Sequence, residues 1–204
     1  MQNVPAGISS VKFEKAGKRQ SWAIDYTNSS VVFSLKRRNL IAAVTRPVEG
    51  RFKAYTGFIH TNGDDFIGAD ISFTVLAHTI DTGNPRRDNL LRSERFLHSQ
   101  LYPTIQFHGV SFEKSKERQY TVEGNCVIHG IVRRTVFDIL YDGTSEDESG
   151  RMVAVFTASG KIRRRDFRLR INLLGEMFVE NEVTVVLKLR FVELEGRICS
   201  YQNC

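Results

Sequence analysis

Apolar and polar residues alternate with a period of two along most of this chain. Successive side chains of a β-strand point to opposite faces, so such alternation predicts strands that are buried on one side. The pattern is cleanest in residues 67–82, where one face of an extended segment carries Ile67, Ala69, Ile71, Phe73, Val75 and Ala77. Further strands are predicted at residues 30–35, 48–60, 104–113, 119–128, 131–141, 151–164 and 182–194.

Short polar segments separate the predicted strands, which favours antiparallel pairing between neighbours. Asn62-Gly63 and the two aspartates that follow form a hairpin-turn signal ahead of residues 67–82. About eight long strands predict an all-β protein, either a closed barrel or a two-sheet sandwich. The alternation is compatible with an interior filled by side chains and with one that holds a ligand. The later connections are residues 114–118, 129–130 and 142–150.

One segment departs from this alternation and is predicted to be the main helix. Asn84 is a suitable N-cap, and Pro85 fits the first helical turn of residues 86–99. A second, shorter helical turn is predicted at residues 172–177. The apolar residues of the main helical segment are Leu90, Leu91, Phe96 and Leu97.

Composition agrees with a strand-rich globular domain and says little about partners. The 204 residues include 14 Phe, 4 Pro and 1 Trp, and Phe favours half-buried pleated surfaces. The 29 basic and 23 acidic residues give a net charge of 29 − 23 = +6, with a pI near 9.4. Such an excess attracts nucleic acid, a membrane surface or a phosphate group without choosing among them, and it is more often only a solvated surface.

The cysteines and the N-terminal residues give further expectations. Cys126 lies in an apolar run and is predicted to be buried, while Cys199 and Cys204 are spaced for a small loop disulfide. No run approaches the ~18 apolar residues of a membrane-spanning helix. Residues 1–18 contain no apolar signal-peptide segment, which predicts a cytoplasmic protein, or a periplasmic one if an export signal was removed.

Patterns that could indicate catalysis have simpler structural explanations. Asp81-Thr82-Gly83 is the tripeptide of aspartic proteases, but that chemistry needs a second such aspartate, and a turn before the helix explains these residues. His129 precedes Gly130 and is predicted to lie in a tight turn between strands. No metal-spaced histidine pair, nucleophile elbow or phosphate loop occurs. We expect no enzyme, no metal and no cofactor, and a hydrolase using His129 or Asp81 is the weakest hypothesis.

The strongest basic run covers residues 161–168. On a strand, Arg164 and Asp166 would share one face, and Arg163, Arg165 and Phe167 the other, so the arginines cannot all project one way. A nucleic-acid reader would instead want basic and exposed aromatic residues on a single face. A structural pairing of Arg164 with a carboxylate, such as Asp88 or Asp166, is at least as plausible as a ligand contact.

A series of short motifs runs through the chain in a fixed order. The blocks are Trp22-Ala23-Ile24-Asp25, Ser29-x-Val31-x-Phe33, Val48-x-Gly50-x-Phe52, Ile80-Asp81-Thr82-Gly83, Arg87-Asp88, Ser93 to Phe96, Tyr102-Pro103-x-Ile105-x-Phe107, Val122-x-Gly124, Ile128-His129-Gly130, Ile162-x-Arg164-x-Asp166-Phe167 and Glu182-Val183-Thr184. Each block alone is weak, but order and spacing together are specific. From about residue 21 to residue 193 the chain resembles the YceI-like family.

The resemblance implies an extended, eight-stranded antiparallel lipocalin-like barrel with one main α-helix between strands. It implies an N-terminal extension at residues 1–20, a barrel domain at residues 21–194 and a tail at residues 195–204. It also implies a hollow barrel that stores or transports a long amphipathic lipid, with a polyisoprenoid preferred, and typical export to the periplasm. The only bound small molecule expected is therefore that lipid.

A Phe-rich lumen would bury a hydrocarbon chain at ~0.8 kcal/mol per CH₂, and a basic mouth would satisfy a polar or pyrophosphate head. Alternation alone leaves either face of each strand open to the lumen. The candidate lumen residues are Phe33, Phe52, Phe58, Phe73, Phe107, Phe137 and Phe156. The candidate polar contacts or structural locks are Arg87, Asp88, His129, Arg164 and Asp166.

Three departures from the family pattern leave the head group open. Asn28, Leu90 and Arg168 stand where the family usually has His, His and Gly. The alternative from another class is a stress-linked interaction protein whose basic face binds an anionic partner, nucleic acid or a membrane surface, in a salt-dependent way. The preferred reading expects no nucleic-acid partner and allows a homodimer.

Overall fold

The structure, a computed structural model, describes residues 19–38, 45–63, 65–170 and 179–194. The strands of this part of the chain are β1 (Gln20–Ile24), β2 (Ser30–Arg38), β3 (Thr45–Phe52), β4 (Tyr55–Thr61), β5 (Asp70–Leu76), β6 (Ile80–Asp81), β7 (Thr104–Lys116), β8 (Gln119–Ile128), β9 (Ile131–Glu146), β10 (Met152–Arg163) and β11 (Glu182–Glu193). The helix is α1 (Pro85–Arg92), and the short 3₁₀ turns are η1 (Tyr26–Asn28), η2 (Ala77–Thr79) and η3 (Arg164–Phe167).

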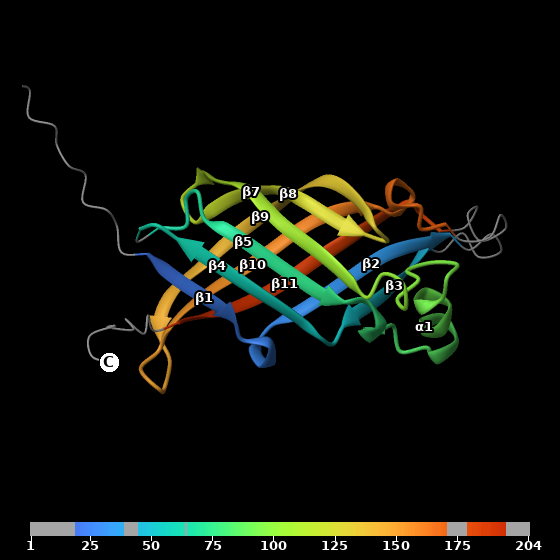
Figure 1. Cartoon of the computed structure of the whole chain (residues 1–204), viewed down its shortest axis with the longest axis horizontal. Helices are drawn as coiled ribbons and strands as arrows, with labels where there is room; N and C mark the ends of the chain where they lie inside the picture. Colours follow the sequence, from blue (N-terminus) through green and yellow to red (C-terminus); the bar gives the residue numbers. More distant parts are fainter. Residues whose placement is uncertain (1–18, 39–44, 64, 171–178, 195–204) are drawn as a thin grey trace, which may run out of the picture.

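The strands form a closed antiparallel barrel. Neighbours around the ring follow the order β1, β4, β5, β7, β8, β9, β10 and β11, and β1 also pairs with β11. That last pairing, with Trp22 opposite Glu193, closes the ring and satisfies what would otherwise be two open sheet edges. Figure 1 shows the strands crossing the long axis of the molecule obliquely. The predicted fold class, an eight-stranded antiparallel barrel with one main helix, is confirmed.

Three strand segments continue barrel strands beyond a bend. β1 and β2 both pair with β11, at residues 191–193 and 184–188, so the two segments follow each other along one neighbour. β3 pairs with β2 as β4 pairs with β1, and β6 pairs with β3 as β5 pairs with β4. The first three strands of the barrel are therefore each built from two segments.

The bends of neighbouring strands lie side by side, and because of one of them a predicted strand is divided in two. Residues 48–60 do not form a single strand, because the chain turns at Lys53-Ala54 between β3 and β4. The backbone N–H groups of Lys53 and Ala54 donate to Thr79 Oγ1, at 3.3 and 3.2 Å. Thr79 lies in η2, the bend of the next strand, which also divides residues 67–82 into β5 and β6. A partner distant in sequence thus determines where the strand is interrupted.

Other strand boundaries differ locally from the predicted ones. β5 begins only at Asp70, and Ile67, expected on the buried face, is 52% exposed. β9 extends to Glu146, into residues predicted to be a connection. Pairing between β10 and β11 ends at Arg163 and Glu182, so residues 164–167 form η3 instead of a continued strand.

The main helix is confirmed but is shorter than expected. Asn84 Oδ1 accepts a hydrogen bond from Arg87 N at 3.1 Å, and Pro85 occupies the first turn, as predicted. The helix ends at Arg92, and residues 93–102 continue in turns. Figure 1 places α1 beside β3, at one end of the barrel. The helical turn predicted at residues 172–177 lies outside the described residues.

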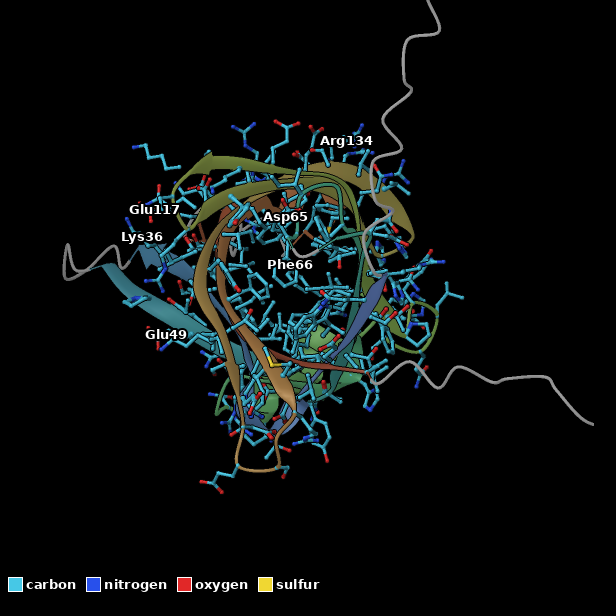
Figure 2. All side chains as sticks on the ribbon, turned by 90° about the vertical axis from the view of Figure 1, so that its left-hand side faces the viewer. Lys36, Glu49, Asp65, Phe66, Glu117 and Arg134 are labelled. Atoms are coloured by element: carbon cyan, nitrogen blue, oxygen red, sulfur yellow. The ribbon has the colours of Figure 1, made fainter. Side chains whose placement is uncertain are left out.

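An aromatic cluster fills the opposite end of the barrel. Phe66 is 5% exposed, and its ring centroid lies 4.9 Å from Phe156, 5.5 Å from Tyr141 and 5.8 Å from Trp22. Figure 2 looks at the molecule from this end and shows Phe66 near the middle of the ring of strands. Rings that meet edge-on or tilted gain favourable contacts beyond the area they bury. We call this group, with Phe112, Tyr120 and Phe191, the aromatic plug.

Candidate functional site

The barrel encloses an elongated cavity of about 580 Å³. This volume lies within the roughly 300–1,000 Å³ typical of small-molecule sites. At one end the cavity is bounded by plug residues such as Phe112, Phe156 and Phe191. At the other it reaches exposed residues of α1 and of the segment after it, such as Leu90, which is 45% exposed. The cavity therefore has a closed end at the aromatic plug and a mouth at α1.

Six of the seven predicted lumen phenylalanines line this cavity. Phe58 does not, and its predicted place in the lumen is wrong. Along β4 the buried positions are Tyr55, Gly57, Ile59 and Thr61, so Phe58 points outward and is 42% exposed. The phenylalanines that line the cavity are Phe33, Phe52, Phe73, Phe107, Phe137 and Phe156.

Glycines on neighbouring strands make room for several of these rings. Gly50 lies directly opposite Phe33, and Gly57 lies directly opposite Phe73. A Cβ atom on either glycine would come within 2.3 and 2.7 Å of the facing ring. A residue without a side chain weakens a strand unless a neighbour covers it, so each ring both lines the lumen and covers a glycine.

Aliphatic residues complete the lumen, and none of them was predicted from the sequence to be a site residue. β11 carries an alternating series in which every second residue lines the cavity. The two-residue period that identified the strands also marks these residues, because every second residue of β11 faces the same side. The lining residues of β11 are Val183, Val185, Leu187, Leu189 and Phe191.

Within the described chain, charged residues line the cavity only at its mouth, and all of them are arginines. Among the described lining residues, all but five are apolar, and the exceptions are Gln106 and four arginines. No described Asp or Glu lines the cavity. The arginines are Arg87 of α1, Arg95 after it, Arg164 of η3 and Arg170 after η3.

Arg87 is held by the turn that precedes α1. Its Nε donates to Thr82 Oγ1 at 2.7 Å, and its Nη2 donates to the Thr82 carbonyl at 2.8 Å. Thr82 in turn donates to Asp88 Oδ1 through its backbone N–H, at 2.9 Å, and through its hydroxyl. Asp88 is 5% exposed and does not line the cavity. It therefore acts as a lock on the turn that positions Arg87.

Arg164 is almost fully buried, at 1% exposure. Its guanidinium donates to the carbonyls of Leu169, Glu180 and Val179, at 3.0, 3.0 and 3.1 Å. The described chain shows no ion pair of Arg164 with Asp88 or with Asp166, so neither of these two example carboxylates is its partner, and pairing with a carboxylate in general stays a prediction. Arginine suits this place because its planar fork can serve several acceptors at once. Arg164 ties the turn after β10 to the chain before β11.

His129 lies behind the cavity wall and does not line the cavity. It occupies the turn between β8 and β9 with φ 53°, followed by Gly130 with φ 70°, which confirms the predicted tight turn. Its ring packs edge-on against Tyr102, with centroids 4.6 Å apart. Burial, and next the positive charge of nearby His98, lower the pKa of His129. These contacts describe a packed turn residue.

Asp81 is not placed for proton-sharing catalysis. It lies 3.0 Å from Lys53 Nζ and 3.3 Å from Arg51 Nη2. The backbone N–H of Gly83, followed by Lys53, lowers the pKa of Asp81 to about 2. An aspartic dyad needs one carboxyl that keeps a shared proton, whereas Asp81 is an ion-paired turn residue.

Asp166 and the exposed members of the basic run, such as Lys161 and Arg163, lie on the outer surface of the barrel, whereas Arg164 of the same run is buried. Asp166 is exposed and borders a groove over β9 and β10, together with Arg163 and Phe167. Two of the basic residues there are paired, Arg134 with Glu123 at 3.3 Å and Lys161 with Glu182 at 2.8 Å. The positive charge of this surface is thus partly balanced by the barrel's own carboxylates.

Two negative findings concern only the described residues. They contain no group of three or more His, Cys, Asp or Glu side chains arranged to hold a metal ion. Within the same ranges, no helix has both the length and the apolar character needed to cross a membrane.

A closed antiparallel barrel with a hollow apolar interior is the architecture of lipocalin-like binding proteins. Residues 22–191 match the family model described as the YceI-like domain, and the chain belongs to this family. Protein YceI of Escherichia coli O157:H7 is 27% identical over 124 residues, which is 61% of this chain. That alignment spans 64% of the relative's length, and the same share holds for Protein YceI of Salmonella arizonae.

Solved structures show the same fold. BcnA of Burkholderia cenocepacia superposes with a TM-score of 0.71 at 17% identity, covering 82% of this chain and 98% of BcnA. A polyisoprenoid binding domain from Saccharophagus degradans superposes with a TM-score of 0.58 at 15% identity, covering 85% and 98% of the two chains. At these identities the comparison supports the architecture of the barrel.

Proposed function

We propose that this protein binds a long-chain amphipathic lipid inside the barrel and stores or transports it without chemical change. The observation that carries the proposal is the elongated cavity of about 580 Å³, whose described lining is apolar along its length and charged only at the mouth. Each methylene that moves from water into such a lumen contributes ~0.8 kcal/mol. Aromatic and aliphatic walls without fixed polar partners suit a hydrocarbon chain better than a polar substrate.

A polyisoprenoid is the preferred ligand. The support is the likeness of the barrel to a domain of Saccharophagus degradans that is described as polyisoprenoid binding. The lining rings of Phe33, Phe52 and Phe73 also offer flat surfaces against which a branched, unsaturated chain can pack. Transport and storage remain two forms of the same proposal, since both need reversible binding in the lumen.

The test is uptake of geranylgeraniol by purified protein, together with organic extraction of lipid that copurifies with it. Ala158→Phe fills the lumen from β10, because Ala158 is 3% exposed and lines the cavity. Ser159→Phe is the matched control, since the next residue points outward. We expect Ala158→Phe to weaken uptake at least tenfold and Ser159→Phe to leave it unchanged. Equal uptake by both variants, with circular dichroism showing an intact barrel, would refute binding in the lumen.

A further inference from the structure

The charged side chains that the described residues place around the cavity mouth all have the same sign. Arg87, Arg95, Arg164 and Arg170 are the charged side chains that line it in the described chain, and no carboxylate accompanies them on the wall. Low-dielectric walls focus the field of such charges into the opening. A ligand whose apolar chain fills the lumen would place its head group within this field.

Two of the four arginines are already used by the fold. Arg87 donates to both oxygens of Thr82, and Arg164 donates to three backbone carbonyls. Their positive charges stay at the mouth, but these bonds fix their positions. They therefore form a rigid, positive background behind the opening.

Arg95 and Arg170 differ from Arg87 and Arg164 because their side chains are exposed and the fold does not hold them. Neither forms an ion pair or a side-chain hydrogen bond with any described residue. Some exposed arginines elsewhere on the barrel do pair with carboxylates, as Arg134 does with Glu123 at 3.3 Å and Arg151 with Asp147 at 2.8 Å. Each free guanidinium offers five N–H donors in a planar fork.

The two side chains come from different parts of the chain. Arg95 follows α1, Arg170 follows η3, and Figure 1 shows α1 and the end of β10 toward the same end of the barrel. Both contribute to the lining of one cavity. A guanidinium binds phosphate or carboxylate oxygens through two parallel hydrogen bonds, which gives geometric selectivity as well as affinity.

We propose that Arg95 and Arg170 select lipids with an anionic head group, a phosphate, pyrophosphate or carboxylate, and hold that head at the mouth. This inference rests on the proposed function, because the chain of the same ligand occupies the lumen. A neutral alcohol of equal chain length would gain the apolar burial but not these contacts. The arginine pair thus sets which head group is favoured, and the lumen sets which chain.

The experiment compares geranylgeranyl phosphate with geranylgeraniol, which share one chain and differ in the head. Inorganic pyrophosphate, titrated alone, is the third probe. The variant is Arg95→Gln with Arg170→Gln. The matched control is Arg133→Gln with Lys188→Gln, which removes the same charge from exposed residues that do not line the cavity. Exposed ion pairs contribute up to about fivefold each, so we expect the double variant to lose about tenfold or more in affinity for the phosphate.

Geranylgeraniol binding should stay within twofold in both double variants, and of the two lipids only the phosphate should bind more weakly as salt rises. Equal affinity of the unaltered protein for the two lipids, or an equal loss for phosphate in the control, would overturn the inference. If neither lipid binds but pyrophosphate does, through Arg95 and Arg170, the anion site stands and the proposed lipid function fails. If none of the three probes binds, both fail.

Discussion

Phe137 of β9 lies directly opposite Gly160 of β10, and its ring covers the glycine. A Cβ atom on Gly160 would lie 2.6 Å from Phe137 Cδ1 and 3.0 Å from the carbonyl oxygen of Val136. The ring is 7% exposed and also meets Phe107 edge-on, with centroids 5.3 Å apart. The lumen-lining ring of Phe137 thus packs directly against the backbone of Gly160, in space that a side chain there would occupy.

Gly160→Ala should therefore destabilise the barrel although alanine is small. The new methyl group has to displace a ring that is packed between two strands, which costs on the order of 1–3 kcal/mol in free energy of unfolding. Urea denaturation measures the loss. Gly63→Ala is the matched control, because a Cβ atom there meets nothing within 4 Å. Equal stability of the two variants would show that the ring does not depend on the glycine.

Phe66→Ala should destabilise the protein more severely. The ring is 5% exposed and contacts the rings of Trp22, Phe112, Tyr141 and Phe156. Removing a buried Phe typically costs about 3–5 kcal/mol, because the cavity left behind is filled only in part. Phe58→Ala, on the outer face, should cost about 1 kcal/mol or less. Thermal and urea unfolding of both variants would check the difference, and similar losses would contradict a plug at this end.

Cys126 should be chemically inert in the folded protein. Burial raises the pKa of its thiol to about 12, although the Thr135 side chain opposes the shift. The thiolate is the reactive form, so alkylation by iodoacetamide at pH 8 should be slow in native protein and fast in urea. A variant with Cys199→Ser and Cys204→Ser isolates this thiol. Rapid alkylation of that variant without denaturant would show that Cys126 is accessible.

Acid should weaken the base of the hairpin between β9 and β10. The backbone N–H of Arg151, then its guanidinium, lowers the pKa of Asp147 to about 2, and Arg190 bridges Asp147 and Asp25. A carboxyl whose folded pKa is depressed stabilises the fold above its unfolded value, near 3.8, and this contribution is lost as pH falls through the folded value. The midpoint temperature of thermal unfolding should therefore decrease as the pH is lowered from about 4 to about 2.

Asp147→Asn should remove part of that acid dependence and lower the midpoint at neutral pH. Asp138→Asn, on the exposed face of β9, is the matched control and should keep the full acid dependence. Melting curves across the pH range compare the three proteins. If Asp147→Asn and the unaltered protein lost stability in parallel down to pH 2, the pairing would not contribute.

The strand pattern was readable from the sequence because alternation is a local property. The bends were not readable in this way. The strand is interrupted at Lys53 and Ala54, whose backbone N–H groups bind Thr79, and Thr79 lies 26 and 25 residues further along the chain. Alternation also left the inner face undecided. Phe58 and Phe73 lie on paired strands and look alike in sequence, yet only register decides that Phe73 faces the lumen and Phe58 faces solvent.

The mouth was predicted least well. Arg87 and Arg164 were candidates from their motif blocks, and both line the cavity. Arg95 and Arg170 carry no motif and no local pattern, and they come to one opening only because α1 and η3 fold toward the same end. Asp166, beside Arg164 in the same motif, lies instead on the outer groove, because η3 ends the strand alternation.

The aromatic plug determines through which end of the barrel a ligand can enter and leave. Among the described residues, Phe66 and its neighbours fill one end of the barrel, so a lipid bound as proposed would enter tail first through the α1 end and leave through the same end. Molecules that carry bulky polar groups at both termini are excluded, because one of those groups would have to come to rest against the rings. If the barrel transports a lipid as proposed, a membrane or protein that receives this lipid has to approach from the α1 side, the same side from which the barrel is loaded.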